Sequence, residues 1–157
     1  MTQRKYNLLD GSDELVDLHS QQVLINNYYP DVKTIITDRS LLCSIKIQDY
    51  SWANKYEIGI IYKTNFEPMV TIINPFIEPS SKIHMYSNRC LCLYYPHDYV
   101  LGKRFCIALE IIPWAIKWIY FYELYLINGN IWQGKEAPHT IDFDGIWSRR
   151  RLHVEKS

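Results

Sequence analysis

The 157-residue chain is long enough to bury a hydrophobic core without disulfides or a structural metal, and it predicts one domain over residues 1–157. Hydrophobic residues make up 48% and charged residues 22%, as in ordinary globular proteins, which argues against disordered and fibrous classes. The formal net charge at pH 7 is zero, so we expect no general electrostatic binding to nucleic acid or to an anionic membrane.

The N-terminus lacks the features of a secretory signal, since residues 1–7 carry positive charges with no apolar stretch behind them. We therefore expect a cytoplasmic protein whose four cysteines stay reduced. The most apolar stretch, residues 111–127, is shorter than the roughly 20 residues that a bilayer requires. It also contains Pro113, Lys117 and Glu123, and it predicts a buried helix.

A first amphipathic helix is predicted over residues 11–29. Ser12 is the expected N-cap, and acidic residues follow it where they suit the positive end of a helix. Leu18 and Ile25 fall on one apolar stripe. The helix is expected to end before Pro30, because a residue that precedes proline avoids helical angles.

Three segments that follow alternate with the two-residue period of half-buried strands, at residues 41–48, 56–63 and 69–73. Residues 34–37 form a shorter β segment before them. The intervening turns are short enough for hairpins. The middle of the chain therefore predicts an antiparallel meander of three to four strands, and the chain as a whole an α+β fold.

The last third of the chain predicts a loop, a long helix and a polar end. Residues 74–81 hold two prolines and no periodicity, which indicates an irregular loop. A helix is expected over residues 112–127, with Trp132 folded back on it; residues 140–157 are expected to be a solvated basic tail, with Arg149, Arg150, Arg151 and Lys156. The helical stripe comprises Ile112, Ala115, Ile116, Ile119, Glu123 and Leu126.

The stretch at residues 83–96 lies between the strands and the long helix, and we interpret it as an active-site loop. It brings His84, Asn88, Cys90 and Cys92 together. Cys92 is the candidate nucleophile because a loop gives a thiol exposure and access. Cys43 and Cys106 are interpreted as small buried hydrophobes, the commonest role of a free cysteine.

Three other uses of this loop remain open from the residues alone. Cys92 could be an inert thiol. A zinc site could draw on Cys90, Cys92, His97 and Cys106, although a single residue between the first two cysteines is shorter than the usual two to four. A cysteine protease could take its base from His84, His97 or His139, although no protease signature surrounds Cys92.

The order of elements resembles that of the ubiquitin-conjugating enzymes, and residues 86–93 are similar to their Tyr-to-Cys-Leu active-site segment. The resemblance covers roughly residues 12–139. It implies a ubiquitin-conjugating-enzyme-like fold in which Cys92 forms the thioester. The family's His-Pro-Asn aligns with residues 82–84, so the resemblance places His84 where an asparagine would steady the oxyanion. His84 is thus expected to be an oxyanion donor or a support for the loop, with Asn88 as a second candidate donor.

The bacterial branch of this superfamily is the better match. Residues 84–86, 91–96, 112–114 and 132–136, together with His139, resemble the short, single-domain conjugating-enzyme-like proteins of type II CBASS anti-phage operons. That resemblance implies a cysteine-dependent acyl transferase in antiviral defence, without a metal or cofactor. Its partner would be a cGAS/DncV-like nucleotidyltransferase.

On this reading the partner's C-terminus is joined to Cys92 and then passed to an amine, with a separate activating enzyme as a further partner. Asp98 or His97 would help to deprotonate the incoming amine. An alternative from a different class is a non-catalytic module of the same fold that only docks the nucleotidyltransferase. Thiol reactivity discriminates between the two, because an inert scaffold would make Cys92 no more reactive than Cys43.

Overall fold

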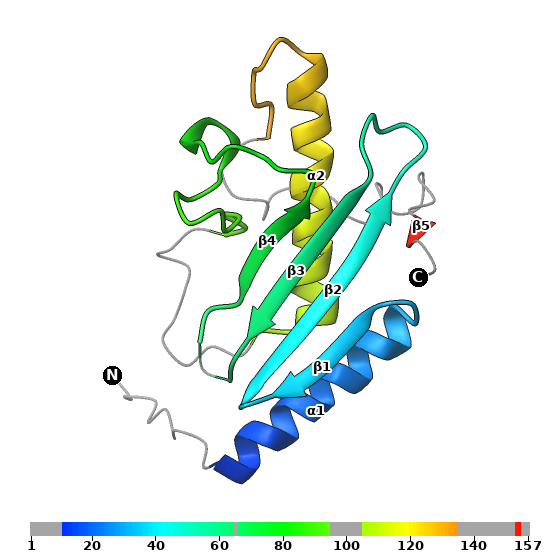
Figure 1. The fold of residues 1–157 in the computed structure, drawn as a ribbon, viewed down its shortest axis with the longest axis vertical. Helices are drawn as coiled ribbons and strands as arrows, with labels where there is room; N and C mark the ends of the chain where they lie inside the picture. Colours follow the sequence, from blue (N-terminus) through cyan, green and yellow to red (C-terminus); the bar gives the residue numbers. More distant parts are fainter. Residues whose placement is uncertain (1–10, 65, 95–104, 135–152, 155–157) are drawn as a thin grey trace, which may run out of the picture.

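An antiparallel sheet lies at the centre of the molecule, and four of its strands follow one another in chain order (Figure 1). They are β1 (Lys33–Thr37), β2 (Ser40–Gln48), β3 (Tyr56–Tyr62) and β4 (Met69–Asn74). The computed structural model describes residues 11–64, 66–94, 105–134 and 153–154. The predicted α+β class and antiparallel meander are confirmed, and residues 34–37 belong to a full strand.

Alternation along β2 and β3 decides which face of the sheet is covered. In β2 the inward positions include Cys43 and Ile45, and in β3 they include Ile58 and Ile60, all at most 5% exposed. The register pairs Cys43 with Ile60 and Ile45 with Ile58, so these side chains share one face. Each buried aliphatic side chain contributes about 1.5–3 kcal/mol relative to exposure. A one-residue slip would move the whole apolar set into water, which fixes the register.

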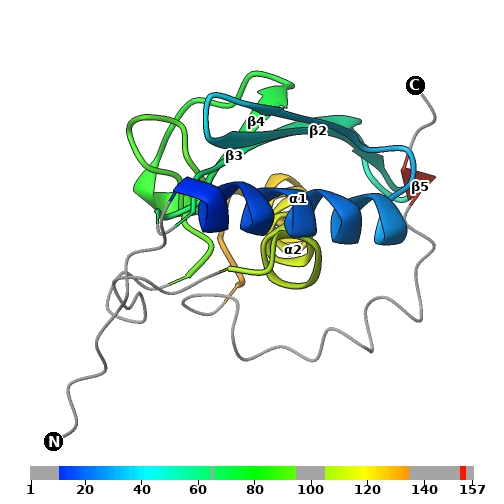
Figure 2. The ribbon, with the colours of Figure 1, turned by 90° about the horizontal axis from the view of Figure 1, so that it is seen from below.

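Two helices cover that face of the sheet, α1 (Gly11–Tyr28) and α2 (Ile112–Ile127) (Figure 2). Leu18 and Ile25 of α1 are fully buried, as predicted. The Gln21 side chain joins the two helical regions, because its amide donates to the Phe105 carbonyl and its Oε1 accepts from the Ile107 N–H at 3.0 Å. No helix within the described ranges is long and apolar enough to cross a bilayer.

The long helix begins at the predicted residue but is preceded by a π-helical turn, η3 (Ile107–Ile111), that the sequence did not indicate. Five of the six stripe residues are buried as predicted, whereas the prediction for Leu126 is wrong, since this side chain is 41% exposed. Leu126 belongs to the last turn of α2, which reaches beyond the end of β4 (Figure 1). None of the described strands extends beneath this turn to cover the side chain.

Glu123 fixes the long loop between β2 and β3 to α2. Its buried carboxylate accepts hydrogen bonds from the Ala53 N–H at 3.0 Å, from the Asn54 backbone and side chain at 3.3 Å each, and from the Tyr56 hydroxyl at 2.6 Å. A buried carboxylate is stable only when its oxygens are satisfied in this way. One helix residue therefore anchors this loop to α2.

The structure describes only two residues of the predicted basic tail. The strand β5 (His153–Val154) pairs antiparallel with β2, Val154 opposite Ile47 and His153 opposite Gln48. This pairing differs from a wholly solvated end. The arginines at 149–151 and Lys156 lie outside the described residues.

Candidate active site

The loop that carries Cys92 is a narrow hairpin attached to the edge of β4. A 3-10 turn, η1 (Ser81–Ile83), leads into it, capped by the Ser80 hydroxyl. Tyr86 and Arg89 then form a tight turn, with the Arg89 N–H donating to the Tyr86 carbonyl at 2.9 Å. The Leu91 N–H donates to the Val70 carbonyl of β4 at 2.8 Å. The loop is thus held by main-chain bonds on the sheet side.

On the opposite side the loop is held to α2. The Trp118 indole N–H donates to the carbonyl of Ile83 at 2.8 Å and to that of His84 at 3.3 Å. The His84 carbonyl also accepts from the Cys92 N–H at 2.9 Å. His84 itself is in the left-handed region, with φ of 53°, a conformation that histidine adopts more readily than most residues. These bonds join the entry and exit of the loop behind the thiol.

The His84 ring packs against the Trp132 ring, with the centroids 5.3 Å apart. Trp132 also contacts the rings of Trp118, Phe121 and Tyr125 on α2. The prediction that Trp132 folds back on the long helix is therefore confirmed. The His84 ring is thus in contact with the aromatic cluster on α2 through Trp132.

Cys92 is partly exposed, and its sulfur lies between two polar groups. The Tyr86 hydroxyl donates to Cys92 Sγ at 3.2 Å, and the thiol in turn donates to the Tyr94 carbonyl at 3.6 Å. Burial of Met85 and Leu91, which pair across the hairpin, leaves the neighbouring Tyr86 and Cys92 turned toward the surface. The arrangement places a hydrogen-bond donor next to the sulfur of a partly exposed residue.

The same contact changes the titration of the tyrosine. The hydrogen bond to Cys92, then burial, then the charges of Cys92 and Glu67 raise the pKa of Tyr86 to about 12. A raised pKa means that the phenol keeps its proton throughout the neutral range. Tyr86 therefore keeps the proton with which it donates to the sulfur. The sequence prediction missed this contact because it used Tyr86 only as a spacing landmark. The tight turn between Tyr86 and Cys92 was the feature that could have indicated their contact.

Of the other cysteines, Cys43 is buried as predicted, whereas Cys90 and Cys106 are partly exposed, so the prediction of a buried Cys106 is wrong. Burial raises the pKa of Cys43 to about 12, in keeping with a thiol that is 5% exposed. Burial and then the charge of Glu67 raise the pKa of Cys90. The Cys90 backbone N–H donates to Asn88 Oδ1 at 3.0 Å, so the Asn88 carbonyl oxygen stabilises the turn, and its amide nitrogen is the part that could serve as a donor.

Three of the candidate site residues, Asp98, His97 and His139, lie outside the part of the chain that the structure describes. Within the described part of the chain, no group of three His, Cys, Asp or Glu side chains could hold a metal ion. The zinc set suggested by the sequence, which needs His97, is therefore not assembled from the described residues.

The sequence matches the model of a known protein family. Residues 21–140 match a family model described as Type II CBASS E2 protein. None of the curated proteins compared with the chain matches it. The matched region covers more than half of the chain and includes both the hairpin with Cys92 and the helix against which it packs.

Proposed function

Because the chain belongs to the Type II CBASS E2 family, we propose that it is a conjugating enzyme that carries an acyl group as a thioester on Cys92. The observation that supports this most is the 3.2 Å contact between the Tyr86 hydroxyl and Cys92 Sγ in an accessible loop. A donor beside a nucleophilic sulfur stabilises negative charge both on the thiolate and on the oxygen of a tetrahedral intermediate.

The donor substrate in this proposal is the C-terminus of a cGAS/DncV-like nucleotidyltransferase. Its carboxyl group arrives already activated, as a thioester on a separate activating enzyme. The Cys92 thiolate attacks the carbonyl carbon, a new C–S bond forms, and the carrier's thiolate leaves. Tyr86 donates to the Cys92 sulfur before the attack and to the adjacent oxyanion during it.

In the second step an amine attacks the thioester. A C–N bond forms, the C–S bond to Cys92 breaks, and the thiolate regains a proton as the nitrogen loses one. The His84 ring supports the loop through Trp132, and the Asn88 amide is a further donor to the oxyanion. Asp98 or His97 would take part in deprotonating the amine. The conjugate would prime the nucleotidyltransferase for anti-phage cyclic-nucleotide signalling.

The test is to incubate the chain with the nucleotidyltransferase, the activating enzyme and ATP, and to look for an adduct by non-reducing electrophoresis and mass spectrometry. We expect an adduct that dithiothreitol removes, that is absent from Cys92→Ala and that persists in Cys90→Ala. An adduct that survives Cys92→Ala but disappears in Cys90→Ala would show that Cys90, and not Cys92, is the nucleophile. Absence of any adduct would favour the docking module over the enzyme.

A further inference from the structure

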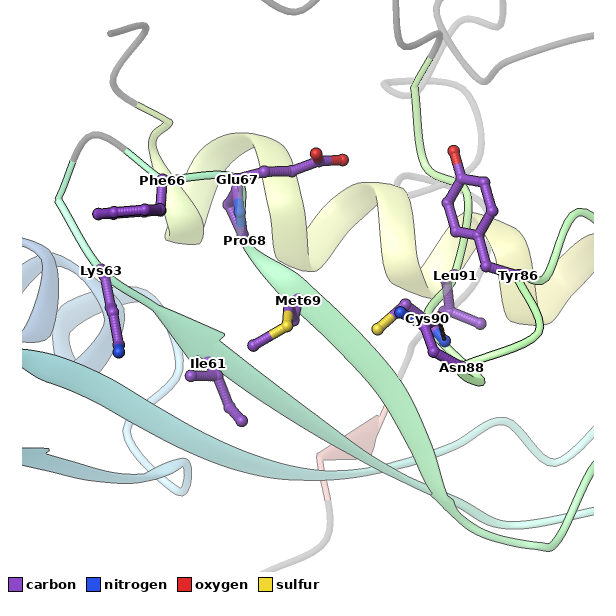
Figure 3. A pocket seen from close by; sticks show the side chains of 10 residues that line it. All are labelled: Ile61, Lys63, Phe66, Glu67, Pro68, Met69, Tyr86, Asn88, Cys90 and Leu91. Carbon is purple, nitrogen blue, oxygen red and sulfur yellow. Dashed lines mark hydrogen bonds between the residues drawn. The ribbon is translucent and has the colours of Figure 1, made fainter. Parts of the chain in front are cut away.

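A groove of about 590 Å³ lies beside the thiol loop, between the hairpin and the end of the sheet (Figure 3). Its apolar part is formed by Ile61 of β3, Met69 of β4 and Leu91 of the hairpin. Ile61 and Met69 are neighbours across the two strands and are 40% and 46% exposed, on the face of the sheet that the helices leave uncovered. The groove therefore offers an apolar track that leads to the hairpin.

Charge is distributed unevenly along this groove. Glu67 acts electrostatically on both Tyr86 and Cys90, since its charge contributes to the raised pKa of each, so the carboxylate lies close to the hairpin. Figure 3 shows Lys63 at the end of the groove away from Tyr86, and the Glu67 side chain extending from the opposite loop toward the tyrosine. The charge that acts on the hairpin from this groove is thus negative.

We propose that this groove is the binding site for the acceptor, a lysine side chain whose methylenes lie on Ile61, Met69 and Leu91 and whose nitrogen reaches the thioester past Glu67. The inference rests on the proposed function. Tyr86 lines the groove and also contacts the sulfur, which connects the two sites through a single residue. An apolar stem that ends in an amine matches an apolar track with a carboxylate beside the hairpin.

Glu67 has a defined part in the chemistry. The neutral amine attacks the thioester carbonyl, and its nitrogen becomes positively charged as the C–N bond forms. A nearby carboxylate stabilises that developing charge, which is absent from the unbound neutral amine, and so lowers the barrier. The nitrogen then loses its proton while the C–S bond to Cys92 breaks, so that amide and free thiol are the products.

A carboxylate-bearing occupant fits the groove less well, because its charge would meet that of Glu67 beside the hairpin. The same argument predicts that the effect of the Glu67 charge on the rate depends on the charge of the attacking group. When a thiolate attacks the thioester it brings a negative charge and forms no cation. Removal of the Glu67 charge should then slow attack by lysine but leave attack by a thiol equal or faster.

The experiment loads Cys92 by exchange with the 2-mercaptoethanesulfonate thioester of N-acetylglycine, and follows the acyl group on Cys92 by peptide mass spectrometry. Discharge is then measured with L-lysine and, separately, with 2-mercaptoethanol. We expect Glu67→Gln to slow discharge to lysine about fivefold, as an exposed charge pair would, without slowing discharge to 2-mercaptoethanol. Glu78→Gln is the matched control, because Glu78 is exposed and does not line the groove. It should alter neither rate.

A second measurement does not depend on the thioester. Millimolar Nα-acetyl-L-lysine amide should shift the methyl NMR signals of Ile61, Met69 and Leu91 in the wild type, and the shifts should weaken in Glu67→Gln. If the loaded Glu67→Gln enzyme discharges to lysine at the wild-type rate, or if the methyl signals of the wild type do not shift, the proposed acceptor site is overturned. If the shifts occur but Cys92 cannot be loaded, the groove stands as an amine site and the proposed transferase fails.

Discussion

Replacement of Tyr86 by phenylalanine removes one hydroxyl and leaves the ring. The hydroxyl donates to Cys92 Sγ at 3.2 Å, and a hydrogen bond to a charged group contributes about 1.5–3 kcal/mol. Because the Tyr86 side chain is 41% exposed, water replaces part of this interaction, and the lower end of the range applies. We therefore expect Tyr86→Phe to slow thioester formation about tenfold, which corresponds to ~1.4 kcal/mol of barrier.

The assay is single-turnover transfer to Cys92, sampled by quenched flow and resolved on non-reducing gels. The free energy of unfolding, measured by urea denaturation, should change by less than about 0.5 kcal/mol, since the lost atom is near the surface. Tyr50→Phe serves as the control because Tyr50 is 84% exposed and belongs to the loop after β2. Transfer by Tyr86→Phe at the wild-type rate would refute the role of the hydroxyl.

Three further predictions concern residues around the loop and in the core. His84→Phe keeps a ring against Trp132 and should retain transfer within about threefold, whereas a hundredfold loss would identify the imidazole N–H as an oxyanion donor. Glu123→Gln places an amide N–H2 against donors such as the Tyr56 hydroxyl and should lower the free energy of unfolding by about 3 kcal/mol in urea denaturation, and an unchanged midpoint would contradict this. Cys43 has a folded pKa of about 12 against 9.0 in the unfolded chain, so its contribution to stability is complete below pH 9.0 and is lost as the pH rises toward 12. Stability at alkaline pH should therefore fall less steeply in Cys43→Ala than in the wild type, and identical slopes in urea titrations would oppose this.

Sequence periodicity predicted the meander and the long helix well because both signals are local. The two-residue alternation at residues 41–48 and 56–63 requires one buried face, and the structure buries it. Leu126 was placed wrongly because a helical stripe does not reveal where the sheet beneath it ends. The π-helical turn at residues 107–111 was also absent from the prediction, since its connection to α1 through Gln21 spans most of the chain.

The candidate site was predicted only in part, for a similar reason. The sequence indicated that Cys92 lies in a loop, but the contact with Tyr86 depends on a tight turn whose backbone has Arg89 at a φ of 69°. The attachment of the loop to Trp118 is a tertiary contact, and the charge of Glu67 acts on the hairpin from another loop, so both depend on residues distant in sequence. No local pattern encodes them.

The claim that Cys92 carries the acyl group is tested most directly by changing the bond that it forms. Cys92→Ser would form an oxygen ester, which resists thiols, in place of a thioester, which thiols cleave. With the nucleotidyltransferase, the activating enzyme and ATP, we predict a wild-type adduct that dithiothreitol removes and a Cys92→Ser adduct that dithiothreitol leaves intact and hydroxide removes. An adduct of Cys92→Ser that remains sensitive to dithiothreitol would contradict the assignment, because the acyl group would then be on another cysteine.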